Sequence, residues 1–192
     1  LSGLLFADDL VLVANSPADL QTSLDAVSTW ATHNEMSFGL SKCGVIQFGP
    51  IPFAPLRTFF LLREPVPVVT QYTYLGVIFT ADLDLTLWVQ TLISKITKIK
   101  LAASHLLSNK DIPIHLRVLV IRALIESRLR YGSALLASKP ALCSIIQRQY
   151  DSIVKLILGS PGSTNSLYAR APLFTELNLP TFRAIVDVAA VT

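Results

Sequence analysis

The sequence is poor in cysteine, in charge and in long apolar runs, and each shortage excludes a class of protein. Its 192 residues include only two cysteines, Cys43 and Cys143, which lie far apart and outside any CxxC spacing. We therefore expect neither a disulfide framework nor a cysteine zinc site, and a reducing intracellular compartment fits this usage. Charged residues make up 15% of the chain, against roughly 25% in typical soluble domains. We expect part of the apolar surface to meet further protein.

No apolar run is long enough for a membrane span, which needs roughly 18 residues. The longest are Leu10–Ala14 and Val118–Ile125, and Arg122 interrupts the second. The first residues carry no basic segment and the only methionine is Met36, so no signal or transit peptide is readable. We expect the sequence to begin inside a longer chain. Its apolar content, 52%, is enough for the core of one large domain or two small ones.

Charge is distributed unevenly along the chain. Residues 1–50 hold one lysine against five acids, a net charge of −4, and residues 95–130 hold eight lysines and arginines against two acids, a net charge of +6. This polarity is typical of a metal site beside a groove for a phosphate backbone. Solvated helix faces without any ligand explain the same pattern equally well.

The first half alternates between strand and helix signals. Two β-prone runs, Leu4–Ala7 and Leu10–Ala14, flank two aspartates and predict a buried hairpin with both carboxylates at its tip. The cap chemistry of Asn15-Ser16-Pro17 predicts a helix that ends near His33. Its buried stripe is expected to contain Leu20, Leu24, Val27 and Ala31.

The segment that follows this helix is rich in proline and in short β-prone runs. Val45–Phe48 is expected to form a strand, and Tyr72–Phe79 another strand with a kink at its glycine. Between them, prolines predict a loop-rich insertion with one short strand. These prolines are Pro50, Pro52, Pro55, Pro65 and Pro67.

From Asp84 onward the apolar period changes from two to 3.6, which predicts three amphipathic helices. The first should bury Trp88, as a core anchor, with Leu92, Ile96, Ile99, Ala103 and Leu106. The second should bury Leu116, Val120, Ala123, Leu124 and Ser127. The third should run from Ile145 to Leu158, with Gly159 as its cap. The whole is an α+β protein in which a mixed part, residues 1–82, precedes an all-helical part, residues 83–192.

The adjacent carboxylates of Asp8 and Asp9 are the strongest local sign of chemistry. Two acids at one hairpin tip repel each other, and a divalent cation is the obvious compensation. Mg²⁺ takes oxygen ligands and keeps waters and substrate phosphates in its shell, as in two-metal nucleotidyl transfer. An Asp-Asp pair in an exposed turn also arises by chance.

The motifs around these aspartates resemble those of reverse transcriptases. An apolar strand, Phe6-Ala7-Asp8-Asp9 and a second apolar strand are similar to the catalytic hairpin, in the Phe-Ala form of non-LTR (LINE-type) retrotransposons. Phe38–Val45 is similar to the next palm motif, in which a lysine follows a helix at the start of a strand. Tyr74–Val77 is similar to the motif that grips the primer end. The helices from Trp88 onward resemble the thumb. Two further stretches resemble later segments of such enzymes: Tyr131–Ser133 and Leu173–Pro180.

The resemblance implies a partial palm (hairpin, helix and strands) over residues 1–82, and a helical thumb with a C-terminal extension over residues 83–192. Asp8 would be the stronger ligand of the catalytic Mg²⁺ ions and Asp9 a weaker ligand or electrostatic partner. Lys42 would lie near the phosphates of the incoming nucleotide and neutralise or protonate the leaving pyrophosphate. An ordinary solvated lysine at a strand start is the alternative for Lys42.

The resemblance also implies which residues contact nucleic acid. Tyr74, Leu75 and Gly76 would hold the 3′ end of the primer, the glycine allowing close approach of the backbone; packing within a palm strand is the alternative. Cations of the thumb would contact the template and primer backbone. These are Lys95, Lys98 and Arg117, together with Arg122, Arg128 and Arg130. Snorkelling side chains, or i,i+4 pairs with Glu126, account for the same cations.

The implied partners are an RNA template, a DNA primer and dNTPs, with Mg²⁺ as cofactor and an intracellular, nuclear location. The family's first catalytic aspartate and its fingers lie upstream of this hairpin. We therefore expect the chain to depend on a missing N-terminal palm and fingers, and not to polymerise DNA alone. Two alternatives stay open: a non-catalytic nucleic-acid-binding module, and an inert remnant of such an enzyme.

Overall fold

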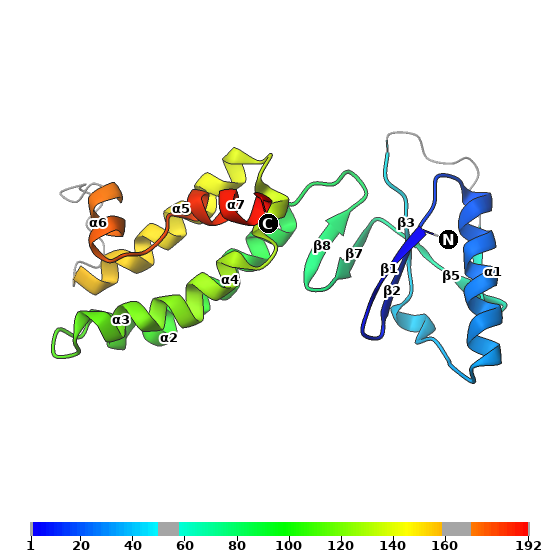
Figure 1. Cartoon of the computed structure of the whole chain (residues 1–192), viewed down its shortest axis with the longest axis horizontal. Helices are drawn as coiled ribbons and strands as arrows, with labels where there is room; N and C mark the ends of the chain where they lie inside the picture. The colour runs from blue at the N-terminus through cyan, green and yellow to red at the C-terminus, as the bar shows by residue number, and fades with distance from the viewer. Residues whose placement is uncertain (1, 50–57, 159–169, 192) are drawn as a thin grey trace. The chain divides into compact units, whose positions relative to one another are not determined.

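The chain divides into two compact units, Leu1–Leu85 (unit 1) and Thr86–Thr192 (unit 2). The computed structural model describes residues 2–49, 58–158 and 170–191. Within these ranges, unit 1 contains one α-helix and small two-stranded sheets, and unit 2 is mostly helical with six α-helices (Figure 1). The expected α+β class is confirmed at this level, and the change from strands to helices comes three residues after the expected boundary. That the units are palm and thumb stays a prediction.

Unit 1 begins with an antiparallel hairpin of β1 (Ser2–Phe6) and β2 (Asp9–Val13), in which Phe6 lies opposite Asp9. The expected hairpin is therefore confirmed. Its expected burial is wrong, because Leu5 is 74% exposed and Leu4 and Phe6 are exposed as well. Two strands alone cover little surface, and no third strand pairs with them among the described residues. Only Leu12 of this hairpin packs against the core of the unit.

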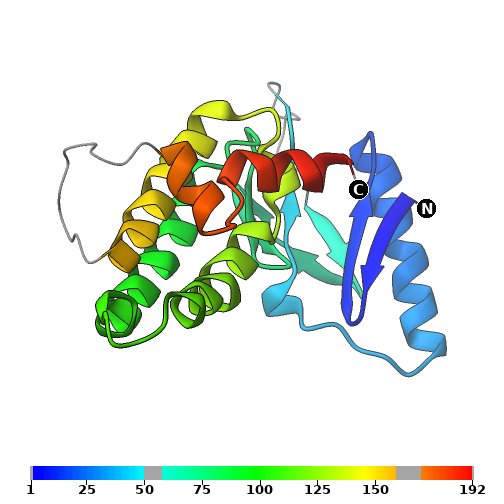
Figure 2. The ribbon, with the colours of Figure 1, turned by 60° about the vertical axis from the view of Figure 1, so that its left-hand side comes forward.

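Helix α1 (Pro17–His33) has the bounds that the sequence predicts. The Ser16 hydroxyl accepts the backbone N–H of Asp19 at 3.1 Å, and Pro17 occupies the first position of the helix. The predicted stripe faces the core: Leu24 and Ala31 are buried, and Leu20 and Val27 are partly buried. Figure 2 shows the β1–β2 hairpin beside this helix.

Helix α1 also packs on a second hairpin, β4 (Phe59–Leu61) with β5 (Glu64–Val66). The Gln21 amide clamps the edge of β4: its Nε2 donates to the Phe60 carbonyl at 2.9 Å, and its Oε1 accepts the Phe60 N–H at 3.0 Å. The core contains Leu24, Phe59, Leu61 and Val66. Strands as short as these, of three residues each, need a helix to pack on, and α1 contributes Leu24 to the core and packs Leu20 and Val27 against it.

The proline-rich segment contains more strand than the sequence predicts. Besides β4 and β5 it includes β6 (Val68–Val69), which pairs in parallel with β3 (Val45–Ile46). The predicted strand Val45–Phe48 is thus shorter than expected. The predictions for Pro50, Pro52 and Pro55 fall outside the described residues.

The predicted single strand Tyr72–Phe79 is wrong, because the chain reverses at its centre. β7 (Gln71–Tyr74) and β8 (Val77–Thr80) form an antiparallel hairpin in which Tyr74 pairs with Val77. The two residues of the turn, Leu75 and Gly76, have φ of 46° and 77°, as in a type I′ turn. Such turns favour Asn-Gly, and a leucine at the first position gives no sequence signal for one.

Unit 2 consists mostly of helices over its described residues, 86–158 and 170–191. Its elements are α2 (Thr86–Ser108), α3 (Ile114–Ile121), a π-helical turn η2 (Arg122–Glu126), α4 (Ser127–Arg130), η3 (Ser133–Leu136), α5 (Pro140–Val154), η4 (Lys155–Leu158), α6 (Arg170–Glu176) and α7 (Phe182–Val191). Helix α5 packs on both α2 and α7. Trp88 is 4% exposed, which confirms it as a core residue. The predicted third helix begins earlier than expected, at Pro140, and its predicted cap Gly159 lies outside the described residues.

The predicted buried face of the second helix is wrong. Its expected members Leu116, Ala123, Leu124 and Ser127 are exposed, and Val120 is only partly buried. The face that is buried consists of Val118, Ile121, Ile125 and Leu129. Both faces are apolar at helical spacing, so the period alone does not choose between them. In α2, Leu107 is buried where Leu106 was expected.

Arg117 is buried on this face, at 7% exposure. Its Nη1 donates to the carbonyls of Leu107 at 3.3 Å and Ile157 at 2.7 Å. These carbonyls belong to the last turn of α2 and to η4, where helix ends leave carbonyls without intrahelical partners. One guanidinium therefore joins two helix ends inside unit 2.

No helix among the described residues is long and apolar enough to cross a membrane.

The burial of Arg117 predicts that reversing its charge destabilises unit 2. Arg117→Glu would place a carboxylate against two carbonyls that need donors, and we expect a loss of about 3 kcal/mol or more in the free energy of unfolding. Lys98→Glu, an exposed control on α2, should change it by no more than about 0.5 kcal/mol. Urea unfolding followed by helical circular dichroism measures both. Equal effects of the two substitutions would contradict this role of Arg117.

Candidate functional site

The turn between β1 and β2 presents the two aspartates. It contains two residues, Ala7 and Asp8, and Asp9 is the first residue of β2. Ala7 has a φ of 52° and Asp8 has no positive φ, the arrangement of type II′ turns, which place glycine at the first position. A left-handed alanine costs roughly 1–2 kcal/mol. Backbone strain of this kind clusters at functional sites.

The register of the hairpin decides which way each carboxylate points. Asp9 lies opposite Phe6, so it shares one face of the hairpin with Phe6, Leu4 and Val11. Asp8 is at the tip, and both carboxylates belong to exposed residues. The turn can therefore offer oxygen ligands to a cation that retains waters in its shell.

The segment Phe38–Val45, which we call the Lys42 segment, follows α1 and contains a short 3₁₀ helix, η1 (Leu40–Lys42). The Lys42 side chain is exposed, and its backbone carbonyl accepts a hydrogen bond of 2.5 Å from the Tyr72 hydroxyl. Tyr72 lies on β7. The segment that contains the predicted lysine is thus attached to the hairpin that contains the predicted primer-binding residues.

The same tyrosine is electrostatically coupled to the aspartate hairpin. Burial raises the pKa of the Tyr72 hydroxyl above its ordinary value, and the ionised forms of Cys43 and Asp9 raise it further. Burial also raises the pKa of the Cys43 thiol. Tyr72 of β7 thus lies against the segment that contains Cys43, and the charge of Asp9 on β2 acts on its hydroxyl. The tyrosine stays a neutral hydrogen-bond donor at physiological pH.

The predicted primer-binding residues lie at the end of the β7–β8 hairpin. Tyr74 is the last residue of β7 and is partly buried, while Leu75 and Gly76 form the turn. Since both turn residues have positive φ, this tip also contains a non-glycine residue in a sparsely populated conformation. The contact with a primer stays a prediction.

The donor set fits part of a magnesium site. Two adjacent carboxylates at an exposed turn match the oxygen ligands and partial hydration that Mg²⁺ prefers. Within the described ranges, no three His, Cys, Asp or Glu side chains come together as one metal-binding group. Asp8 and Asp9 would therefore hold the ion together with water, phosphate oxygens or a further carboxylate.

The predicted nucleic-acid-binding cations of unit 2 differ in availability. Lys95 and Lys98 are exposed on α2, whereas the guanidinium of Arg117 is occupied by two carbonyls. The others also have partners: Arg122 donates to the Asn178 carbonyl at 2.6 Å, Arg128 to the Leu124 carbonyl at 2.7 Å, and Arg130 forms an ion pair with Glu126 at 2.6 Å. Thirteen lysines and arginines against five acids still give unit 2 a net charge of +8. Nucleic-acid contact by these residues stays a prediction.

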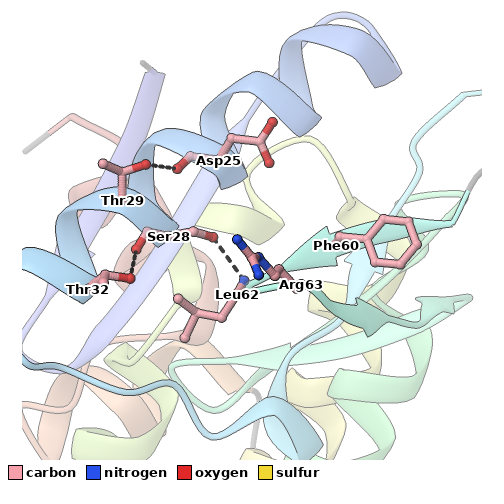
Figure 3. A pocket seen from close by; sticks show the side chains of 7 residues that line it. All are labelled: Asp25, Ser28, Thr29, Thr32, Phe60, Leu62 and Arg63. Atoms are coloured by element: carbon pink, nitrogen blue, oxygen red, sulfur yellow. Dashed lines mark hydrogen bonds between the residues drawn. The ribbon is translucent and has the colours of Figure 1, made fainter.

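A separate groove of about 640 Å³ lies between α1 and the β4–β5 hairpin (Figure 3). It is lined by Asp25, Ser28, Thr29 and Thr32 of the helix and by Phe60, Leu62 and Arg63 of the hairpin. The three hydroxyls donate to carbonyls within α1, and the Ser28 oxygen also accepts the Leu62 N–H at 3.0 Å. These hydroxyls serve the local fold, and the lining includes none of the predicted site residues.

Comparison with family models, with curated proteins and with solved structures finds no match to this chain.

Tyr72 was not among the predicted site residues. Alternation along β7 puts it on the same face as Tyr74, which was predicted. That spacing was the available signal. Its partner, the carbonyl of a residue thirty positions earlier, becomes visible only when the parallel pair β3–β6 brings the two segments together.

The strained turn predicts opposite effects for the same substitution at two alanines. Ala7→Gly should stabilise unit 1 by about 0.5–1 kcal/mol, because glycine adopts a positive φ without steric cost. Ala26→Gly, on an exposed position of α1, should destabilise it by about 1 kcal/mol. Amide hydrogen exchange of α1 and β4 measures both changes. A loss of stability at Ala7 equal to that at Ala26 would argue against the left-handed turn.

Proposed function

We propose that this chain provides the catalytic hairpin and the primer-binding part of a reverse transcriptase of the non-LTR retrotransposon type. The observation that carries this proposal is the grouping in unit 1. The Asp8–Asp9 turn, the Lys42 segment and the β7–β8 hairpin belong to one compact unit, and Tyr72 connects the last two while lying near Asp9. Metal ligands, a cation for phosphates and a primer contact are the parts that nucleotidyl transfer needs together.

Each part has a distinct task in the proposed reaction. Asp8 and Asp9 hold Mg²⁺, which supplies Lewis-acid stabilisation of the charge that develops on the phosphates. Lys42, exposed and anchored through its own backbone, neutralises the leaving pyrophosphate or donates a proton to it. The turn at Gly76 allows the backbone to approach the 3′ end of the primer. The first aspartate of the family would come from an upstream palm strand.

Unit 2 has the charge expected of the part that holds the template and primer. Its net charge of +8 contrasts with the −5 of unit 1, where three lysines and arginines stand against eight acids. Phosphate contacts supply most of the affinity in such complexes and carry no sequence information. Exposed Lys95 and Lys98 are the side chains best placed for them.

A second candidate function is binding of nucleic acid without catalysis. The same charge of unit 2 favours it, and it needs neither a metal nor a third carboxylate. An enzyme and a binding module differ in what the aspartates do, since only the enzyme requires them.

Primer extension tests the enzyme proposal, in a form of the protein that includes the upstream palm strand and fingers. Asp8→Asn keeps the size of the side chain and removes its charge, so it should abolish extension while duplex affinity stays nearly unchanged. Asp9→Asn should impair extension less. Lys42→Ala should slow turnover less than Asp8→Asn does, since proton donation contributes on the order of 10²–10⁴-fold.

Asp25→Asn, an exposed acid on α1, is the matched control and should leave extension unchanged. If Asp8→Asn extends primers at the parental rate, the hairpin is not the catalytic site.

Salt dependence tests the role of unit 2. The chain should bind a primer–template duplex weakly and without sequence preference, with an affinity that falls steeply as salt rises. Lys95→Glu and Lys98→Glu should each reduce the slope of log K against log salt by about 1. Lys139→Glu, exposed at the start of α5, serves as the control. Binding that is insensitive to salt, or absent at low salt, would eliminate both the binding module and this role of unit 2.

A further inference from the structure

The Tyr72 hydroxyl supports the backbone at the lysine that the proposed function places beside the phosphates. It donates to the carbonyl of Lys42, the last residue of η1. The final carbonyls of a helix lack intrahelical partners, so this one is open to an outside donor. The ammonium of Lys42 is exposed and forms no hydrogen bond or ion pair among the described residues. The backbone of Lys42 is therefore fixed, and its side chain is left available.

The ring of Tyr72 is held in place by close packing on Gly44. A Cβ added at Gly44 would lie 3.3 and 3.4 Å from two ring carbons of Tyr72, and 3.2 Å from Cγ2 of Val69 on β6. These distances leave no room for a side chain without movement of the ring. Because Gly44 has no side chain, the Tyr72 ring can pack against it in the position from which its hydroxyl bonds to the Lys42 carbonyl.

The same region adjoins the aspartate hairpin. Leu12 of β2, Cys43 and Val45 pack on one apolar cluster, so the strand that follows Asp9 and the segment that follows Lys42 share a core. The effect of the Asp9 charge on the pKa of Tyr72 agrees with this proximity. Strand β2 and the segment after Lys42 therefore share one core, and Tyr72 contacts that segment through Lys42 and Gly44.

We propose that Tyr72 is a positioning residue, whose hydroxyl fixes the Lys42 segment beside the Asp8–Asp9 metal turn. The inference rests on the proposed function and adds to it the group that sets the distance between the lysine and the metal. Without the hydroxyl bond the end of η1 loses its outside support, and the lysine samples positions away from the carboxylates. Tyr74, two residues further on the same face of β7, donates no such bond among the described residues and provides a matched comparison.

The distance can be measured in the chain as it stands with Mn²⁺ as the probe. Lys42 is the sole lysine of unit 1, so reductive methylation with ¹³C-formaldehyde gives it an NMR signal that Lys42→Arg identifies. Mn²⁺ bound at the turn broadens nearby signals, with an effect that falls steeply with distance. In the parent chain we expect Mn²⁺ to broaden the amide signals of residues 7–10 together with the methyl signal of Lys42.

Tyr72→Phe keeps the ring on Gly44 and removes the hydroxyl. We expect Mn²⁺ still to broaden the amides of residues 7–10 to the same extent, while the broadening of the Lys42 signal falls severalfold. Tyr74→Phe should leave both unchanged. Gly44→Ala, which displaces the ring, should reproduce the effect of Tyr72→Phe. Unchanged amide spectra of α1 and β4 in the variants would show that the unit remains folded.

The outcomes separate this inference from the proposed function. If Mn²⁺ fails to broaden residues 7–10 of the parent chain, the metal turn itself is wrong and the inference falls with it. If Mn²⁺ binds at the turn and Tyr72→Phe leaves the Lys42 broadening at the parental level, the metal turn stands and the positioning role of Tyr72 is overturned. A loss at Lys42 with an intact metal site supports it.

Discussion

Left-handed backbone at three tight turns is the constraint on which unit 1 depends. The turns contain Ala7, Leu62 with Arg63, and Leu75 with Gly76, and only one of these residues is glycine. Because side chains alternate along a strand, the turn of a hairpin sets the register and thereby the face on which each residue lies. The positions of Asp9 and Tyr72 follow from two of these turns. Short strands with a small shared core must hold the strained residues in place, and the Gln21 clamp on β4 contributes to this.

The sequence predicted those parts of unit 1 that have local signals. Ser16 and Pro17 identified the start of α1, and the two aspartates between apolar runs identified the first hairpin. The hairpin turns at Leu62 and Leu75 were not predicted, because leucine carries no preference for positive φ and the conformation is imposed by the pairing of the strands. The site residues were named from a family resemblance, whereas Tyr72 depends on a contact between distant segments that no local pattern reveals.

In unit 2 the sequence did not predict which face of a helix is buried, nor which of its cations are exposed. The chain around residues 114–130 is apolar on two sides, so the period of 3.6 predicted a helix and left its orientation undetermined. Arg117 was predicted to contact the nucleic-acid backbone, whereas its buried guanidinium donates to the carbonyls of two helix ends. A long flexible side chain with several donors can serve a buried helix end, and sequence position alone does not distinguish that role from contact with a phosphate.

The π-helical turn Arg122–Glu126 gives this helical segment a built-in length adjustment. The N–H of Ser127 reaches back to the carbonyl of Arg122, five residues earlier, so the turn accommodates one residue more than an α-helical turn would. Each residue of an α-helix turns the chain by about 100°. The extra residue therefore sets the rotational phase of the residues that follow it, including exposed Arg130, which forms an ion pair with the buried carboxylate of Glu126. Loss of one residue here would restore an ordinary α-helix and rotate α4 away from its present partners. A compensating insertion further along would restore the rotational phase of the residues that follow that insertion.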